Sequence, residues 1–158
     1  MIANENLEMS HLIVRVVDTE ATLAFWVKGL GAELESDEEL EAPALDAIFG
    51  RTGVKIRDTF IRYSGIRLHT IEMLDVPRER PAVAVDPQTS LGIGGLAFHV
   101  PDIEKSRTEA ENRGLKPTPI YDFDDLATPV RMYFLGDPDG IRLEMIEERQ
   151  PDVPDRTR

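Results

Sequence analysis

One short motif occurs twice in this chain, and this repeat constrains the fold more than any other feature of the sequence. GIRLHTIEM begins at Gly65 and GIRLEMIEE begins at Gly140, so the same four residues precede His69 in one copy and Glu144 in the other. Imidazole and carboxylate side chains are both common metal ligands. The repeat predicts two related modules whose equivalent strands carry different functional side chains.

The patterns around the motif extend the repeat to two whole modules. Each half has a strand pattern, a capping Asp, a helical pattern that ends at a glycine, and further extended stretches joined by hairpin turns. Each half therefore predicts a β-α-β-β-β module. The strand and helix patterns cover residues 11–31 and 95–116, the helices stop at Gly31 and Gly114, and the hairpin turns fall at Ser64-Gly65 and Asp139-Gly140.

The length of 158 residues predicts a single domain over residues 1–158. Within it, the two modules are expected at 9–74 and 93–148. The stretch 75–92 has three prolines and no clear periodicity, so we expect a linker there. The polar end of the chain, 149–158, is expected to be a flexible tail.

Charge and composition exclude several classes of partner. Thirty acidic against eighteen basic residues give a net charge of −12, which argues against nucleic acid. Six of these acids lie between Glu33 and Glu41 and predict a solvated loop or strand edge. No apolar run approaches the ~20 residues of a membrane helix, so no membrane partner is expected. The opening MIANENLEMSHL lacks a signal pattern and the chain has no cysteine, which favours a cytoplasmic location.

Strand alternation predicts which side chains share a face. Successive side chains of a strand point to opposite sides. Mostly apolar residues occupy one face of each repeated strand, and we expect these faces to pack on helices. The opposite, concave faces then hold His11, Ile13 and Arg15 in the first strand, Arg67, His69 and Ile71 in the first copy of the motif, and Arg142, Glu144 and Ile146 in the second, against buried Leu68, Leu143 and Met145.

The two βαβββ modules, the His at the start of the first strand and the late DPDGIRLEMIE segment resemble the vicinal oxygen chelate superfamily. This superfamily includes glyoxalase I, methylmalonyl-CoA epimerase, extradiol dioxygenases and bleomycin resistance proteins. The resemblance covers residues 9–148. It implies an α+β fold in which two βαβββ modules form an incomplete eight-stranded barrel around a central cavity that holds a metal ion.

The resemblance also implies a set of metal ligands. The four ligand positions of the superfamily fall on His11, His69, Gly95 and Glu144, and glycine has no side chain to bind with. His11, His69 and Glu144 remain, and two imidazoles with one carboxylate suit a divalent ion of Fe, Mn, Ni, Co or Zn. Replacing Gly95 by His is expected to add a fourth ligand. Glu72 is an alternative to His69, since IEML also resembles a ligand-bearing strand, although alternation places it on the opposite face.

Further polar residues share the faces of the proposed ligands. His99 follows Gly95 on the same face and is a candidate acid or base together with Glu144, or else a wall residue with a structural hydrogen bond. Arg15, Arg67 and Arg142 are candidates for binding a substrate carboxylate or phosphate, or else arginines in solvent at the rim.

The resemblance implies a metal-dependent enzyme that acts on a small, vicinally oxygenated metabolite. The most favoured reaction is that of an isomerase or lyase through a metal-stabilised enolate. One alternative is an extradiol-type dioxygenase, which is disfavoured because Phe134 stands where those enzymes have Tyr. Another is a non-catalytic protein that sequesters a drug or metabolite, as bleomycin resistance proteins do.

A second copy of the chain is the expected protein partner. Leu23, Trp26, Val27 and Leu30 fall at helical spacing, and Trp26 together with the apolar strands at a module edge needs cover. We therefore expect a homodimer with C2 symmetry.

Overall fold

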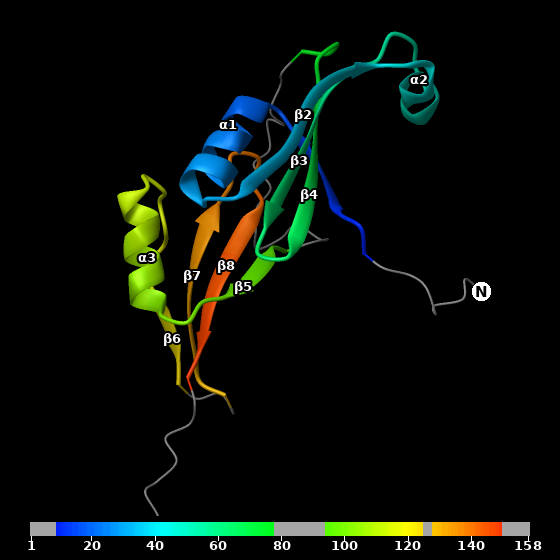
Figure 1. The fold of residues 1–158 in the computed structure, drawn as a ribbon. Helices are drawn as coiled ribbons and strands as arrows, with labels where there is room; N and C mark the ends of the chain where they lie inside the picture. The colour runs from blue at the N-terminus through cyan, green and yellow to red at the C-terminus, as the bar shows by residue number, and fades with distance from the viewer. Residues whose placement is uncertain (1–8, 78–93, 125–127, 150–158) are drawn as a thin grey trace, which may run out of the picture. The chain divides into compact units, whose positions relative to one another are not determined.

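A computed structural model of the protein describes residues 9–77, 94–124 and 128–149. The chain forms two compact units, Met1–Pro81 and Ala82–Arg158, each with its own sheet and helices (Figure 1). Most of the predicted linker, 75–92, and nearly all of the predicted tail lie outside the described residues. No helix among the described residues is long and apolar enough to cross a membrane.

The first unit is a four-stranded sheet in the order β1-β4-β3-β2. Strand β1 runs parallel to β4, and the other neighbours are antiparallel. Its elements are β1 (Leu12–Val16), α1 (Thr19–Leu23), which continues as the π-helix η2 (Ala24–Gly29), β2 (Glu33–Glu41), α2 (Pro43–Phe49), β3 (Lys55–Tyr63) and β4 (Ile66–Met73).

The second unit repeats this arrangement. Its sheet has the order β5-β8-β7-β6, again with the first and last strands parallel. The prediction of an α+β fold built from two βαβββ modules is confirmed. The elements are β5 (Leu96–His99), α3 (Ile103–Asn112), β6 (Tyr121–Phe123), β7 (Val130–Gly136) and β8 (Arg142–Glu148).

The helix starts and stops follow the local signals of the sequence. Asp18 accepts a hydrogen bond from the N–H of Ala21 at 3.2 Å, and Asp102 does the same for Lys105 at 2.9 Å. Such side-chain caps satisfy donors that the first turn of a helix leaves free. At the other ends, Gly31 and Gly114 adopt φ values of 78° and 80°, and the hairpin turn at Ser64-Gly65 has φ values of 46° and 83°. These conformations favour glycine, which explains the predicted stops.

The first helix buries only part of the apolar stripe that indicated it in the sequence. Of Leu23, Trp26, Val27 and Leu30, only Trp26 is buried. The second half of the helix has π-helical spacing, in which a hydrogen bond spans five residues in place of four. The N–H of Leu30, for example, donates to the carbonyl of Phe25 at 2.9 Å. This π-helical winding rotates later side chains away from the α-helical stripe.

Trp26 does not require a second subunit to cover it. Its side chain is 1% exposed, and within the first unit its ring meets those of Phe25 and Tyr63 at centroid distances of 5.7 and 5.9 Å. The expectation that Trp26 lies uncovered at a module edge is therefore wrong. The reason is that the side chain is already buried, with the rings of Phe25 and Tyr63 of the same unit against the indole.

The acidic run forms the edge strand β2, as one of the two predicted alternatives. Arginines of β3 and β4 pair with two of its acids: Arg57 forms an ion pair with Asp37, and Arg62 and Arg67 pair with Glu35. Helix α2, which directly follows this strand, was not predicted. Pro43 at its first position and the left-handed Gly50 after its end are the local signals that identify it.

The predicted faces of the strands are confirmed by the register. Ile13 lies opposite His69, and Leu12 lies opposite Leu68. Leu68 and Leu143 are 1% and 0% exposed on the faces that the helices cover. In both units the predicted ligand positions therefore lie on the sheet face that the helices do not cover.

Candidate functional site

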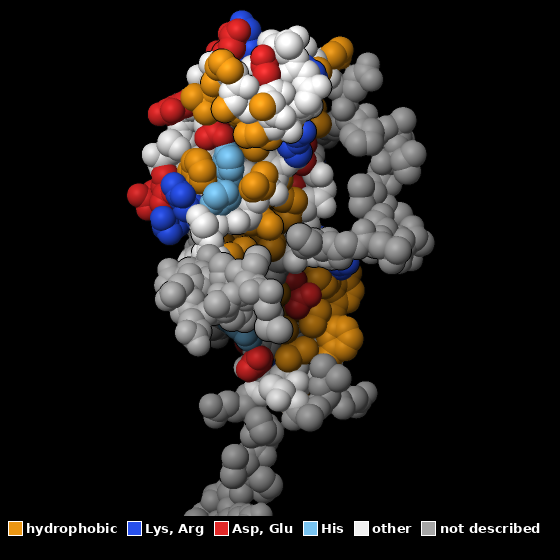
Figure 2. Space-filling view, turned by 90° about the vertical axis from the view of Figure 1, so that its right-hand side faces the viewer, with side chains coloured by type: hydrophobic (Ala, Val, Ile, Leu, Met, Phe, Trp, Pro, Cys, Tyr) orange, Lys and Arg blue, Asp and Glu red, His pale blue; other side chains and the backbone are white. Residues whose placement is uncertain are grey.

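The first unit brings two of the predicted ligands together. The rings of His11 and His69 lie 5.2 Å apart between centroids, at an angle of 78°. Phe60 of β3 stacks on His69 at 4.4 Å and meets the edge of His11 at 5.5 Å. Figure 2 shows histidine side chains side by side in the upper part of the view, with hydrophobic and basic side chains near them.

Asp58 holds the ring of His69. The Nε2–H of His69 donates to the carboxylate Oδ1 of Asp58, and both side chains are largely buried. The other ring nitrogen, Nδ1, is buried and has no hydrogen-bond partner among the described residues. A histidine whose N–H is held by a carboxylate presents its second nitrogen as a lone pair, which is the usual state of a metal-binding imidazole.

The sequence analysis did not identify Asp58 or Phe60. The signal for both was available in the Ser64-Gly65 hairpin, since this turn determines the register of β3 against β4. That register sets Phe60 opposite His69. Alternation along β3 then places Asp58 on the same face as the imidazole.

Glu72 lies on the other face of β4. It is 1% exposed, and its carboxylate Oε2 accepts a hydrogen bond from the backbone N–H of Thr19 at 2.8 Å. Thr19 is the first residue of α1, whose free N–H groups and dipole favour a carboxylate. This contact explains Glu72 as a support for the helix and favours His69 over Glu72 as the ligand of this strand.

The residues of the first unit fit a divalent metal ion. His69 has a buried nitrogen without a partner, and His11 contacts Ser10 Oγ through Nδ1 at 2.9 Å, which leaves its Nε2 for a ligand. Two imidazoles suit Fe, Mn, Ni, Co or Zn. In the described ranges, no set of three His, Cys, Asp or Glu side chains already stands in metal-binding geometry.

The second unit carries the predicted carboxylate. Glu144 is half-buried on β8, with Ala97 of β5 and Phe134 of β7 beside it. His99 belongs to the same face, opposite Ile146. Its side chain is 71% exposed and its Nε2 lies 3.8 Å from Glu148.

Gly95 is explained by close packing of two backbones. A Cβ atom at this position would lie 2.6 Å from the carbonyl oxygen of Arg142, closer than side-chain carbons approach oxygen. Only glycine lets the start of β5 lie this near to β8. The expectation that Gly95→His adds a fourth ligand is therefore wrong, since any side chain there would push the two strands apart.

The candidate arginines of the first unit are already engaged. Arg67 donates to Glu35 at 2.5 Å, and Arg62 donates to the other oxygen of the same carboxylate at 2.6 Å. These contacts lower the pKa of Glu35, and the hydrogen bond from Arg67 is the largest cause. Arg15 donates to the sulfur of Met73 at 3.1 Å and lies 4.7 Å from the centre of the Phe49 ring.

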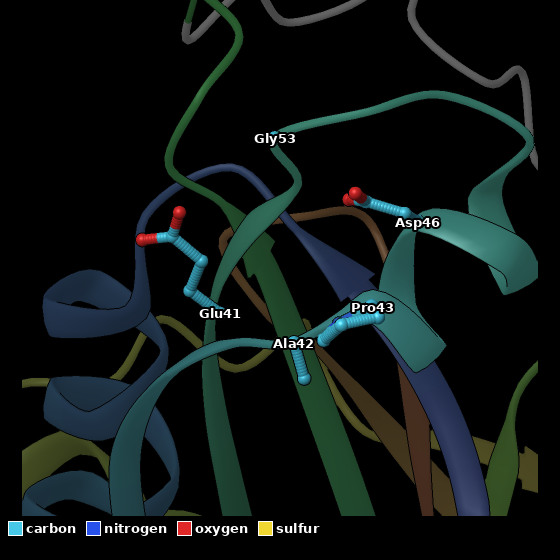
Figure 3. Close-up of a pocket in the computed structure, with 5 residues that line it drawn as sticks. All are labelled: Glu41, Ala42, Pro43, Asp46 and Gly53. Carbon is cyan, nitrogen blue, oxygen red and sulfur yellow. The ribbon is translucent and has the colours of Figure 1, made fainter.

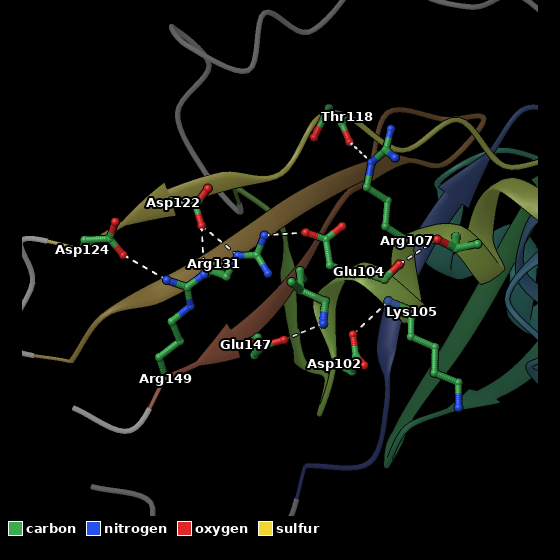
Figure 4. Close-up of polar contacts among 12 residues, drawn as sticks. Asp102, Glu104, Lys105, Arg107, Thr118, Asp122, Asp124, Arg131, Glu147 and Arg149 are labelled. Atoms are coloured by element: carbon green, nitrogen blue, oxygen red, sulfur yellow. Dashed lines mark hydrogen bonds and ion pairs between the residues drawn. The ribbon is translucent and has the colours of Figure 1, made fainter. Parts of the chain in front are cut away.

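Arg142 of the second unit has different surroundings. Its guanidinium lies 3.5 Å from the centre of the Phe134 ring. Within the described ranges it forms no hydrogen bond or ion pair. By contrast, Arg107, Arg131 and Arg149 each pair with a carboxylate (Figure 4).

A wide hollow of about 410 Å³ lies elsewhere, at the start of α2 (Figure 3). Glu41, Asp46 and Gly53 are among its lining residues, and none of the predicted ligands is. The Oδ1 of Asp46 accepts a hydrogen bond from the N–H of Val54 at 2.9 Å. We assign Asp46 to the support of the loop that follows α2.

The family follows from the sequence as a whole. The profile of the Glyoxalase/Bleomycin resistance protein/Dioxygenase superfamily matches residues 8–145, which is most of the chain and both units. The chain belongs to this superfamily. A comparison with curated proteins finds no match.

Solved structures of the superfamily share this fold. The glyoxalase family protein from Bacillus cereus has a TM-score of 0.71 at 17% identity and covers 95% of this chain and 99% of its own. The glyoxalase family protein from Enterococcus faecalis has a TM-score of 0.64 at 24% identity, with coverage of 89% and 97%. Lactoylglutathione lyase from Agrobacterium tumefaciens has a TM-score of 0.53 at 16% identity, with coverage of 91% and 96%. These identities establish a shared fold and leave the reaction to be argued from the residues.

Proposed function

We propose that this protein is a metal-dependent enzyme of the superfamily that acts on a small, vicinally oxygenated metabolite, as an isomerase or lyase. The observation that carries the proposal is the state of His69, whose Nε2–H is held by Asp58 while its buried Nδ1 has no partner among the described residues. A buried polar atom without a partner is costly unless a ligand satisfies it. The adjacent His11 provides a second imidazole.

The roles of the residues follow from their chemistry. His11, His69 and Glu144 hold the ion, and Asp58 fixes the orientation and tautomer of His69. A divalent ion held by these ligands would act as a Lewis acid toward two neighbouring oxygens of a substrate. Phe60 packs against both imidazoles. His99 and Glu144 are the candidates for moving a proton in the reaction.

Metal analysis of the full chain tests the proposal. Purified protein is stripped with a chelator, loaded separately with Fe(II), Mn, Ni, Co and Zn, dialysed and analysed for bound metal. We expect one ion per chain, and we expect His69→Ala and Glu144→Ala each to lose it. Glu72→Ala is the matched control, because its side chain lies on the opposite face of the same strand and should leave the metal bound.

Two results would contradict the proposal, the first its enzyme class and the second its ligand assignment. A protein that retains none of the five metals, but is stabilised equally by apolar ligands with and without them, is a sequestering protein. Loss of metal in Glu72→Ala with retention in His69→Ala would mean that the wrong face of β4 has been assigned.

We also propose that the protein forms a C2 homodimer. The described part of the first unit leaves Ile13 59% exposed on its uncovered sheet face and Ile48 73% exposed on α2. Exposed apolar side chains of this size are typical of contact surfaces when they cluster. Sedimentation at micromolar concentration is expected to give a species of twice the 17.8 kDa chain mass, and a purely monomeric species would refute the dimer.

A further inference from the structure

Two equivalent arginines of the repeat have opposite surroundings. Arg67 precedes His69 by two residues, and Arg142 precedes Glu144 by two residues, so each shares the face of a proposed ligand. Each guanidinium also lies over a phenylalanine of the neighbouring strand, at 3.9 Å for Arg67 and 3.5 Å for Arg142. The two sites differ in what else lies beside the guanidinium.

The positive charge of Arg67 is used within its own unit. Its cross-strand neighbour is Arg62, and both donate to the carboxylate of Glu35. Because the Nε–H of Arg67 donates to Glu35, a side-on pair with a ligand carboxylate would have to displace Glu35, and the charge of Glu35 repels an anion.

Arg142 has glycines where Arg67 has charged or aromatic neighbours. Its cross-strand neighbour on β7 is Gly136, and Gly95 approaches its backbone from the side of β5. A Cβ atom added at Gly136 would meet nothing within 4 Å. The space beside the guanidinium is therefore free of side chains from these two positions. No described carboxylate or carbonyl accepts a hydrogen bond from the guanidinium of Arg142.

Phe134 provides a fixed support for this arginine. Thr118 bonds to both backbone groups of Phe134, since its Oγ1 accepts from the N–H at 2.9 Å and its N–H donates to the carbonyl at 2.9 Å. The ring of Tyr121 lies 6.1 Å away on the same strand pair. A guanidinium stacked on an anchored ring loses little conformational freedom when it binds a planar anion.

We propose that Arg142 binds a carboxylate group of the substrate, which makes the substrate a small carboxylic acid. The planar fork of N–H donors matches a carboxylate with two parallel hydrogen bonds. The link to the reaction rests on the proposed function, since Glu144 lies on the same face of β8 at roughly 7 Å along the strand. A substrate that places two oxygens at the ion and a carboxylate a few atoms away would reach both.

The net charge of −12 limits where the protein can hold an anion. A chain of this charge repels small anions at long range, so an anion is held only where a cation contacts it directly. Arg142 meets this requirement in the second unit. Arg131, in the same unit, does not, because Glu104 and Asp122 already accept its hydrogen bonds.

Succinate is a suitable probe because its carboxylates are planar and it needs no metal to bind an arginine. The full chain, stripped of metal with a chelator, is titrated with succinate while the arginine Nε–Hε signals are followed by NMR. The Arg142 signal, assigned by its loss in Arg142→Met, should shift and saturate. The affinity should fall about tenfold or more in Arg142→Met and stay within about twofold in Arg67→Met, because the charge-assisted pair with succinate is lost only in the first.

A milder variant covers the case in which Arg142→Met does not fold. Arg142→Lys keeps the charge and the aliphatic stem, yet an ammonium group cannot form the two parallel bonds, so it should bind succinate more weakly than the wild type. An unshifted Arg142 signal, equal binding by Arg142→Lys, or a shift with inorganic phosphate and not with succinate would each overturn the carboxylate assignment.

The same samples separate this inference from the proposed function. If the chain binds succinate through Arg142 but retains no metal, the carboxylate site stands and the metal-dependent enzyme fails. If the chain retains metal while succinate leaves Arg142 unshifted, the enzyme stands and the carboxylate site is overturned.

Discussion

The carboxylate of Glu72 accepts the backbone N–H of Thr19 at 2.8 Å, and the second unit repeats this contact between Glu147 and the N–H of Ile103 at 2.5 Å. Thr19 and Ile103 are the first residues of α1 and α3. The last part of each motif strand therefore anchors the helix of its own unit. The repeated motif carries a structural carboxylate on one face and a candidate ligand on the other.

Removal of this anchor should destabilise the first unit. Glu72→Ala leaves a buried N–H without its partner, and we expect the free energy of unfolding to fall by about 2 kcal/mol, measured by urea denaturation. Glu72→Gln keeps an acceptor oxygen and should cost less. The equivalent Glu147→Ala should have a smaller effect because Glu147 is only half-buried. A neutral Glu72→Ala would show that the contact contributes nothing.

Gly95 should tolerate no side chain. Gly95→Ala places a methyl group 2.6 Å from the carbonyl of Arg142 if the strands stay in place, so we expect a loss of about 1–3 kcal/mol in the free energy of unfolding. Gly94→Ala is the matched control. A Cβ atom there meets nothing within 4 Å, and the change should stay within about 0.5 kcal/mol. Equal stability of both variants would contradict the close approach of β5 to β8.

Asp58 should determine how tightly the ion is held. Asp58→Asn keeps the size of the side chain but removes the charge that holds Nε2–H of His69. Loss of such a supporting carboxylate typically lowers metal affinity by about 10–100-fold. Competition with a chelator of known affinity measures this change. An unchanged affinity in Asp58→Asn, with complete loss in His69→Ala, would restrict Asp58 to a structural role.

Acid should loosen the edge strand β2 first. Hydrogen bonds from Arg57 to Asp37 and from Arg67 to Glu35 lower the pKa of both carboxyl groups in the folded protein. Their contribution to stability is therefore fully present above the ordinary carboxyl pKa of about 4 and is lost as the pH falls through the lowered folded values.

Denaturation with urea between pH 7 and pH 3 measures this contribution. We expect Asp37→Asn to flatten the decline below pH 4. Glu38→Gln, which alters a carboxylate on the same strand without a described ion pair, should follow the wild-type curve. Parallel curves for Asp37→Asn and wild type would exclude the Arg57 pair as a source of the pH dependence.

The sequence by itself determined the repeat, the two βαβββ modules and the faces of their strands. These features are local: alternation of side chains, capping Asp residues, and glycines at helix ends are properties of short segments. The assignment of His11, His69 and Arg142 to faces without helices followed from the same alternation. The helical spacing around Trp26 predicted a helix there but did not indicate the π-helical winding of η2.

Only the tertiary structure decided which partner each of these side chains meets. Asp58 beside His69, Glu35 beside Arg67 and the glycines around Arg142 come from neighbouring strands, and their meeting depends on strand register. Register is set by turns and packing across the sheet, so identical GIRL segments received different neighbours. The repeat thus specified equivalent positions, and cross-strand contacts made one arginine structural and left the other available to a ligand.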